Sequence, residues 1–308
     1  MIFGMTIDQI LWYFIIYSFI GWIVEVIFHA ITVGKVINRG FLNGPWCPIY
    51  GFGMLGILSV INSLPKSNGE VNPLLLFIVG MIICTLVELI GGWVLDVAFN
   101  TRWWDYSDKP LNFHGYICLE FSIFWGLGVL IVVDIFHDMI NSNIVAKIPP
   151  TIGRPILGII CISLLADFIV TVLTINGLNK KLKEIDELSA ALRQPSDKLS
   201  QVVAGETIKT TAKLEETRLQ ATLAKAELKD LLYNKDLENT IMCRGQMIEN
   251  EHLADYKRYI DQLAQLKAKV HTITKSRNIG TGRLLNAFPE MKNHRYEDIL
   301  QEIKNYFK

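Results

Sequence analysis

The chain has 308 residues, of which 51% are hydrophobic and only 19% are charged. This composition is unusual for a soluble protein of that length. The formal net charge of zero hides a division, because residues 1–178 carry −4 and residues 179–308 carry +4. An argument from net charge would miss this division, and we expect no nucleic-acid partner.

The cysteines argue against a disulfide-rich or zinc-binding protein, and the N-terminus argues against a secreted one. None of the five cysteines forms a CxxC pair, and four lie in or beside apolar segments, which argues against a disulfide framework and a zinc site (Cys47, Cys84, Cys118, Cys161, Cys243). The first apolar run has no Lys or Arg before it and no clear cleavage site after it. We therefore interpret it as an uncleaved membrane anchor rather than a secretory signal.

Five apolar segments predict membrane spans, because a helix needs about 20 apolar residues to cross the hydrocarbon core. They cover about 10–33, 45–61, 73–99, 116–136 and 155–178. The second is short and rich in Pro and Gly, so we expect it to be irregular or partly re-entrant. The sequence thus predicts an all-α polytopic membrane domain over residues 1–178.

Loop charge predicts the orientation of these spans. With the N-terminus outside, seven cations fall in inner segments (Lys35, Arg39, Arg102, Lys109, Lys180, Lys181, Lys183). Three cations fall in outer segments (Lys66, Lys147, Arg154). We therefore predict a bacterial cytoplasmic-membrane protein with its N-terminus outside and its C-terminus in the cytoplasm.

Beyond the last span, residues 179–275 predict a cytosolic helical or coiled-coil region. A first apolar stripe runs from Leu178 to Leu192 and is interrupted at Gln194-Pro195, because Pro disfavours helix at the preceding residue. Further stripes cover 214–231 and 253–270, with steps of three and four. Two antiparallel helices, a small bundle or a homo-oligomeric coiled coil would each satisfy these stripes.

Residues 276–308 complete the chain as a basic segment and a terminal helix. The basic part could contact anionic lipid headgroups or form a solvated surface. An amphipathic helix is predicted at the end from apolar residues at helical spacing (Tyr296, Ile299, Leu300, Ile303, Phe307).

One motif has the residue spacing of a dinucleotide-binding site but not its structural context. Gly51-Phe52-Gly53-Met54-Leu55-Gly56 has the GxGxxG spacing but lies inside an apolar span. Dinucleotide binding needs a strand before those glycines, so close helix packing is the better interpretation. The sequence contains no GxxxxGK[ST], HExxH or GxSxG string. We expect no cofactor, leave a metal open, and assign any ATP hydrolysis to another chain.

Acidic residues inside the predicted membrane domain are the most informative feature of the sequence (Glu25, Glu88, Asp96, Glu120, Asp134, Asp167). A charge at the centre of a bilayer costs about 2.5–3.5 kcal/mol on insertion scales. Glu88, Gly92 and Asp96 follow at steps of four and share one helix stripe. These acids either pack as hydrogen-bonded glue, line an ion, proton or ligand pathway, or act in catalysis.

Two predicted inner loops gather the remaining candidates. One holds Asn38 and Arg39, and the other places five residues within a short stretch (Trp104, Asp105, Asp108, Asn112, His114). The adjacent tryptophans there are typical of the headgroup belt. Arg39 could pair with one of the loop carboxylates across a shared vestibule.

These loops also carry a resemblance to a known family. The strings are Phe19-Ile20-Gly21-Trp22 with Glu25, Gly34-Lys35, Asn38-Arg39-Gly40-Phe41-Leu42, Gly44-Pro45, Pro48-Ile49-Tyr50-Gly51, Trp103-Trp104-Asp105-Tyr106-Ser107, Asn112, Gly115 and Ile117-Cys118-Leu119. Over about residues 10–135 the chain resembles the bacterial family of putative ABC-transporter type IV proteins, or CmpB-like permeases. The string Arg283-Leu284-Leu285-Asn286-Ala287-Phe288-Pro289 also looks like tails in this family. The resemblance implies an integral-membrane permease component and supplies no substrate or assigned residues.

The sequence therefore predicts a permease-like transport component in the lipid bilayer, with an inward-facing acidic cavity and a separate ATPase subunit. Its candidate cavity residues are Glu25, Glu88, Asp96, Glu120, Arg39, Asn38, Trp104, Asp105, Asp108 and Asn112. Two alternatives stay open: a membrane-embedded enzyme acting on lipid or envelope precursors, and a non-catalytic scaffold that recruits a partner through its helical region.

Overall fold

The computed structural model describes residues 4–34, 36–61, 63–67, 70–204, 261, 265, 268 and 281–307. Within these residues, helices dominate the secondary structure. The chain forms two compact units, one of residues 1–176 with 279–295 and one of residues 177–278 with 296–308. The segment 276–308, expected as one part, is therefore divided between the two units.

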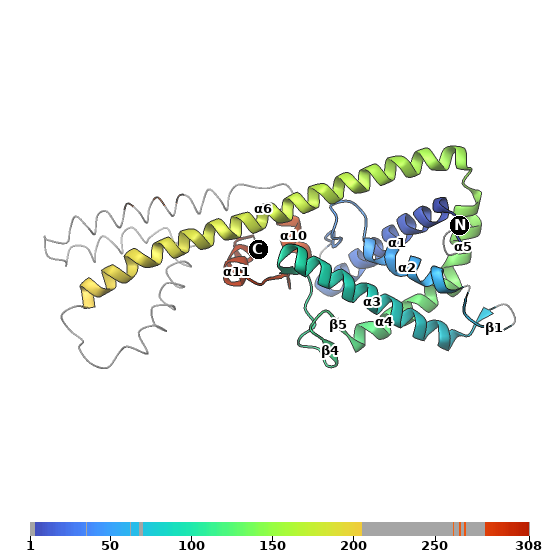
Figure 1. The fold of residues 1–308 in the computed structure, drawn as a ribbon, viewed down its shortest axis with the longest axis horizontal. Coiled ribbons are helices and arrows are strands. Elements are labelled where there is room, and N and C mark those ends of the chain that lie inside the picture. The colour runs from blue at the N-terminus through green and yellow to red at the C-terminus, as the bar shows by residue number, and fades with distance from the viewer. Residues whose placement is uncertain are drawn as a thin grey trace. The chain divides into compact units, whose positions relative to one another are not determined.

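The first unit is built from helices joined by short ribbons. Its helices are α1 (Ile7–Val33), α2 (Pro48–Ile61), α3 (Pro73–Phe99), α4 (Leu119–Ile131), the π-helical η1 (Val132–His137), α5 (Asp138–Asn143), the 3-10 helix η2 (Val145–Lys147), the first part of α6 (Pro150–Ala204), and α10 (Thr281–Ala287). Six two-residue strands pair antiparallel: β1 (Lys66–Ser67) with β2 (Glu70–Val71), β3 (Thr101–Arg102) with β6 (Lys292–Asn293), and β4 (Asn112–Phe113) with β5 (Ile117–Cys118). Figure 1 shows β1 beside α5 at one end of this unit and β4–β5 at the other, here termed the loop end.

Among the described residues, four helices are long and apolar enough to cross a membrane: Ile7–Thr32, Pro73–Phe99, Leu119–Lys147 and Pro150–Leu188. Large apolar side chains cover their outer faces, such as Ile90, Ile159 and Leu173. Lipid accounts for such a surface, whereas water would not. The chain is an all-α polytopic membrane protein.

The second predicted span is a shorter helix than a full crossing needs. α2 has 14 residues, so it is about 21 Å long, against a hydrocarbon core of about 30 Å. It begins at Pro48 rather than at residue 45, because residues 36–47 form a loop.

Three other predicted boundaries differ from the structure. The fourth span begins at Leu119, because residues 112–118 form the β4–β5 hairpin, and it continues through η1 into α5. The fifth is part of α6, which begins at Pro150. The interruption predicted at Gln194-Pro195 is wrong, since α6 continues to Ala204. Proline removes one helical hydrogen bond and biases its predecessor, but a helix that is already long on one side can propagate past it.

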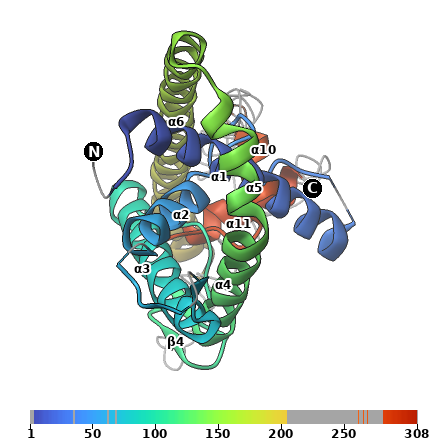
Figure 2. The same cartoon turned by 90° about the vertical axis from the view of Figure 1, so that its right-hand side faces the viewer.

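Glycines bring the helices of the first unit close together. A Cβ on Gly51 would overlap Ser18 and Phe14 of α1, and one on Gly56 would lie 2.7 Å from Ile83 of α3. The packing interpretation of the GxGxxG string is therefore confirmed. Figure 2 shows α2 between α1 and α3, as these two contacts require.

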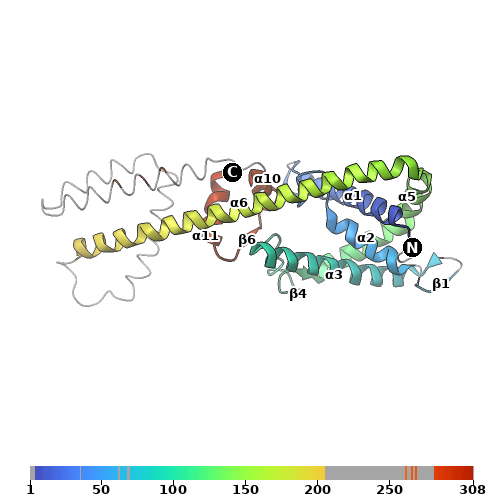
Figure 3. The same ribbon diagram turned by 45° about the horizontal axis from the view of Figure 1, so that its top comes forward.

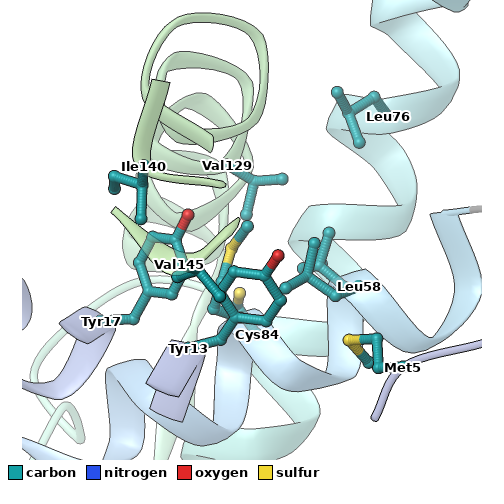
Figure 4. Close-up of a cluster of buried hydrophobic side chains, with 11 residues drawn as sticks. Met5, Tyr13, Tyr17, Leu58, Leu76, Cys84, Val129, Ile140 and Val145 are labelled. Carbon is teal, nitrogen blue, oxygen red and sulfur yellow. The ribbon is translucent and has the colours of Figure 1, made fainter. Parts of the chain in front are cut away.

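The core of this unit is apolar and lies toward the β1–β2 end. Tyr13 and Tyr17 of α1 pack there with side chains of α2, α3 and α4 (Figure 4). Each tyrosine hydroxyl has a polar partner, Asn141 Oδ1 at 2.7 Å for Tyr13 and His137 Nδ1 at 2.9 Å for Tyr17. Three cysteines are buried and Cys161 is partly buried, while Cys243 lies outside the described residues.

The second unit contains the C-terminal part of α6 and α11 (Glu297–Phe307). Leu178, Leu182 and Ile185 are buried, which confirms the first apolar stripe. The terminal amphipathic helix is also confirmed, with Ile299 and Leu300 buried on one face. The stripes predicted at 214–231 and 253–270 lie outside the described residues, apart from residues 261, 265 and 268. The coiled coil and the homo-oligomer stay predictions.

Candidate functional site

One buried stripe of α3 organises the site. It repeats at steps of four and then three: Leu76, Gly80, Cys84, Glu88, Gly92, Asp96, Phe99. Two acids on it are almost fully enclosed, because Glu88 is 4% exposed and Asp96 is 7% exposed. The shared face predicted for Glu88, Gly92 and Asp96 is confirmed.

Within the part of the chain that the structure describes, the hydrogen bonds of Glu88 come from neutral groups. The Tyr106 hydroxyl donates to its Oε1 at 3.1 Å, and the Trp125 indole Nε1 donates to its Oε2 at 2.9 Å. These donors come from the loop after α3 and from α4. Both carboxylate oxygens are therefore satisfied, but the hydrogen bonds bring no positive charge to Glu88.

Glu25 joins the same network from α1. The Tyr50 hydroxyl donates to Glu25 Oε1 at 2.8 Å, and the Tyr50 ring meets the Trp125 ring edge-on at 5.1 Å. We term these residues the Glu25–Glu88 network: Glu25, Tyr50, Trp125, Glu88 and Tyr106. Four helices and one loop contribute to it, so it crosses the interior of the bundle.

Arg39 pairs with Glu25, and not with a carboxylate of the second loop as expected. Its guanidinium lies 3.6 Å from Glu25 Oε2. The neighbouring Asn38 explains this position, because its Oδ1 accepts from the Trp22 indole at 2.8 Å and from the Gly40 amide at 3.0 Å. These bonds fold the loop back along α1, one turn from Glu25.

Asp96 anchors a second polar group at the loop end. It accepts from the Tyr116 hydroxyl at 2.6 Å, contacts His294 Nε2 at 2.5 Å, and lies 3.6 Å from an Arg102 nitrogen. Arg102 also stacks its guanidinium over the Tyr116 ring at 4.6 Å. This acid is therefore charge-paired, in contrast to Glu88.

Asp105 is the counterpart of Asp96 on the loop itself. Lys292 Nζ lies 2.6 Å from its Oδ2, Arg102 lies 3.4 Å from its Oδ1, and Ser107 donates a backbone N–H at 3.0 Å. Burial would raise the pKa of Asp105, but Lys292 and Ser107 outweigh it and hold that pKa well below its usual range. Asp105 is therefore charged at neutral pH.

Aromatic rings cover the helix surface beside Gly92. A Cβ on Gly92 would lie 3.0 Å from the Trp104 ring and 3.1 Å from the Tyr116 ring. Trp104 is fixed there because its indole donates to the Tyr116 carbonyl at 2.9 Å. Trp103 does not belong to a headgroup belt either, since it is 3% exposed and packs edge-on against Phe41 and Phe288.

The remaining candidates, Glu120, Asp108 and Asn112, lie in or next to the loop between α3 and α4. Glu120 pairs with Lys109 at 2.9 Å and is about half exposed, and Asp108 is exposed. Asn112 shapes the loop, because it donates to the Lys109 carbonyl at 2.7 Å and accepts from the Gly115 amide at 3.1 Å. Gly115 has φ +71°, which a side chain would strain. The structure thus separates these three from the Glu25–Glu88 network.

Two side chains that the sequence interpretation did not place in the site hold the first loop. Asp167 of α6 accepts the backbone N–H of Asn43 at 2.9 Å and of Gly44 at 2.7 Å. Arg283 donates to the carbonyls of Gly40 at 2.8 Å and Phe41 at 3.1 Å. Arg283, Lys292 and His294 carry no spacing signal that links them to the loops. The family-like string beginning at Arg283 is the one sequence feature that points to them.

Comparison with known proteins identifies the family. The sequence profile described as putative ABC-transporter type IV matches residues 12–172, just over half of the chain. The chain belongs to this family. The type IV match covers α1 to the middle of α6 and ends before the segment that carries Arg283, Lys292 and His294. No curated protein and no solved structure matches the chain.

The described residues contain no group of three or more His, Cys, Asp or Glu side chains that could hold a metal ion.

Proposed function

We propose that this chain is the membrane component of a transporter, and that the Glu25–Glu88 network is the polar part of its pathway. Family membership supports a transport component in a membrane. The network supplies the finer assignment, since it links the interior of the bundle to the loops at its loop end.

The observation that carries this proposal is the environment of Glu88. Its side chain is 4% exposed, and the hydrogen bonds to both oxygens come from neutral donors. An enclosed carboxylate without a counter-charge is costly unless it takes up a proton or a cation. Glu25 lies across the Tyr50–Trp125 contact and differs from Glu88, because it is partly exposed and paired with Arg39 at 3.6 Å, at the end of the network nearer the first loop. The pair therefore suits the passage of a proton or a small cation.

The proposed direction follows the loop charges. We place the loop end of the bundle in the cytoplasm, because Arg39, Arg102 and Lys109 favour that side, as do three lysines that follow the apolar part of α6 (Lys180, Lys181, Lys183). In this orientation Glu25 and Glu88 lie in the cytoplasmic half of the bundle. Energy for transport would come from a separate ATPase subunit, because this sequence has no phosphate-binding loop.

Native membranes test the assignment to a transport complex. The tagged chain, purified in mild detergent, should recover a separate ATPase and show no saturable ATP binding on its own. Single cysteines at Ser67 and Lys198 should label from opposite faces of intact cells, with Ser67 outside. Labelling of both from one face, or ATP binding by the isolated chain, would contradict the proposal.

A further inference from the structure

The loop 38–44 is irregular backbone, and among the described residues it takes part in no helix or strand pairing. Its amide groups at Asn43 and Gly44 bind Asp167, and its carbonyls at Gly40 and Phe41 bind Arg283. Arg283 Nε also donates to Asn43 Oδ1 at 3.1 Å. The Asp167 carboxylate therefore accepts hydrogen bonds from N–H groups of this loop, and the Arg283 guanidinium donates hydrogen bonds to its carbonyl groups.

The depth of the loop explains why such partners are needed. Asp167 is the eighteenth residue of α6, so it lies about 25 Å along that helix. This position falls inside the apolar stretch Pro150–Leu188, so the loop that Asp167 holds lies beside the membrane-spanning part of α6. At that depth, irregular backbone must be satisfied by protein groups. The short α2 leaves room for this loop within the bundle.

Arg283 belongs to the segment 281–295, which packs against the loop end of the first unit. Within residues 281–295, Phe288 packs against Trp103, and β6 pairs with β3 in the register Thr101↔Asn293 and Arg102↔Lys292. Figure 3 shows β6 beside the C-terminal end of α3. Because this segment belongs to the same compact unit as residues 1–176, its cations are part of the membrane domain.

The guanidinium geometry is specific to arginine. Four of the hydrogen bonds around the loop come from one planar group, to three carbonyls and one amide oxygen. A lysine ammonium cannot reproduce this fork. Burial lowers the pKa of Arg283 and the charge of Asp167 opposes that change, so the group keeps its charge at neutral pH.

We infer that Arg283 is a positioning residue of the proposed transport site. By binding the carbonyls of residues 38, 40 and 41, it fixes the loop that holds Arg39 against Glu25. The role assigned to Glu25 rests on the proposed function. The docking of residues 281–295 and the ordering of the loop by Arg283 do not rest on it.

Site-specific labelling in the full chain tests this inference without a transport assay. Leu42 is 2% exposed in the loop, and Val145 is 7% exposed near the opposite end. Each is changed to Cys, and its maleimide labelling in membranes is followed by peptide mass spectrometry, so the native cysteines can remain. Arg283→Ala should speed labelling at residue 42 about tenfold and leave residue 145 unchanged, because only the loop opens locally.

Arg295→Ala is the matched control, since Arg295 is exposed in the same segment. It should leave both labelling rates unchanged. Equal acceleration at residues 42 and 145 in Arg283→Ala would mean a general loss of structure and would overturn the positioning role. Unchanged labelling at residue 42 would overturn it as well.

A disulfide tests the docking independently of Arg283. Directly opposed residues of antiparallel strands have Cβ atoms about 4.5–5.5 Å apart, close to the spacing of a disulfide. Thr101→Cys with Asn293→Cys should therefore crosslink on mild oxidation in membranes, whereas Thr101→Cys with Arg295→Cys should not. Failure of the first pair, or equal crosslinking of both, would contradict the docking. Neither result depends on whether Glu88 serves transport.

Discussion

The two halves of α3 share one buried stripe, but the side chains that pack against that stripe are apolar in one half and polar in the other. Between Leu76 and Cys84 the stripe is apolar, and Gly80 lets Val129 of α4 pack directly against the backbone. Between Glu88 and Asp96 it is polar, and hydroxyl and indole groups reach in from α4 and from the loop after α3. The same periodicity therefore builds a dry contact in one half and a hydrogen-bonded network in the other.

A second contrast lies within the polar half. Asp96, near the end of α3, is paired with His294 and Arg102. Glu88 lies two turns deeper, and among the described residues its hydrogen bonds come from the neutral groups of Tyr106 and Trp125. Charge pairing suits a residue that fixes structure, whereas an unpaired enclosed acid suits a residue that exchanges a proton or cation. The predictions below test this division, beginning with the largest expected effect on stability.

Asp96→Asn should destabilise the protein most. It removes the charge that faces Arg102 and His294 and weakens the bond from Tyr116, at a cost of about 2–3 kcal/mol. The melting temperature in detergent measures this loss. Asp108→Asn, at an exposed acid of the same loop, is the control and should leave the melting temperature unchanged. If Asp96→Asn melted at the wild-type temperature, this would contradict the structural role that distinguishes Asp96 from Glu88.

Gly80→Ala should destabilise the apolar half by a smaller amount. Its Cβ would lie 2.7 Å from Val129, and a β-branched side chain has few rotamers with which to withdraw. Overpacking costs typically about 1–3 kcal/mol, against a helix-propensity gain of about 1 kcal/mol. Gly91→Ala on the same helix is the control, because its nearest neighbour is at 3.6 Å. Equal melting temperatures for the two variants would contradict the close α3–α4 contact.

Asp105→Asn should have a smaller effect that depends on pH. The native pKa of Asp105 is held below its ordinary value of about 3.9, so its contribution is complete above that value and is lost as the pH falls further. Lys292 is half exposed, so screening reduces the effect to about 1 kcal/mol. The difference from wild type should be equal at pH 7 and pH 5 and shrink below about pH 4. A difference that grows in acid would refute this assignment.

The sequence was sufficient for features that depend on local periodicity. The apolar runs predicted α1, α3, α4 and the membrane part of α6, because span length and helix period are properties of contiguous residues. The stripe of Glu88, Gly92 and Asp96 followed for the same reason. The end of the fourth span was less accessible, because η1 and α5 continue the helix past Phe136 although the sequence becomes polar there (His137, Asp138, Asn141, Ser142, Asn143).

What the sequence could not provide were partners distant along the chain. Arg39 was paired with the wrong acid, because the return of the loop toward α1 depends on the bond from Trp22 to Asn38. Lys292 and His294 lie almost 200 residues from the acids that they contact. Periodicity within one segment carries no information about such contacts, so half of the polar site could be found only from the fold.

The assignment of Glu88 to the transport pathway is tested most directly by Glu88→Gln. Gln keeps the size of the side chain and accepts from Tyr106 or Trp125, but it removes the charge. The account predicts an unchanged melting temperature in detergent together with lost complementation of a deletion strain. Glu120→Gln, at the exposed pair with Lys109, should preserve both. Full complementation by Glu88→Gln would contradict the pathway and leave Glu88 as a packing residue of a membrane scaffold.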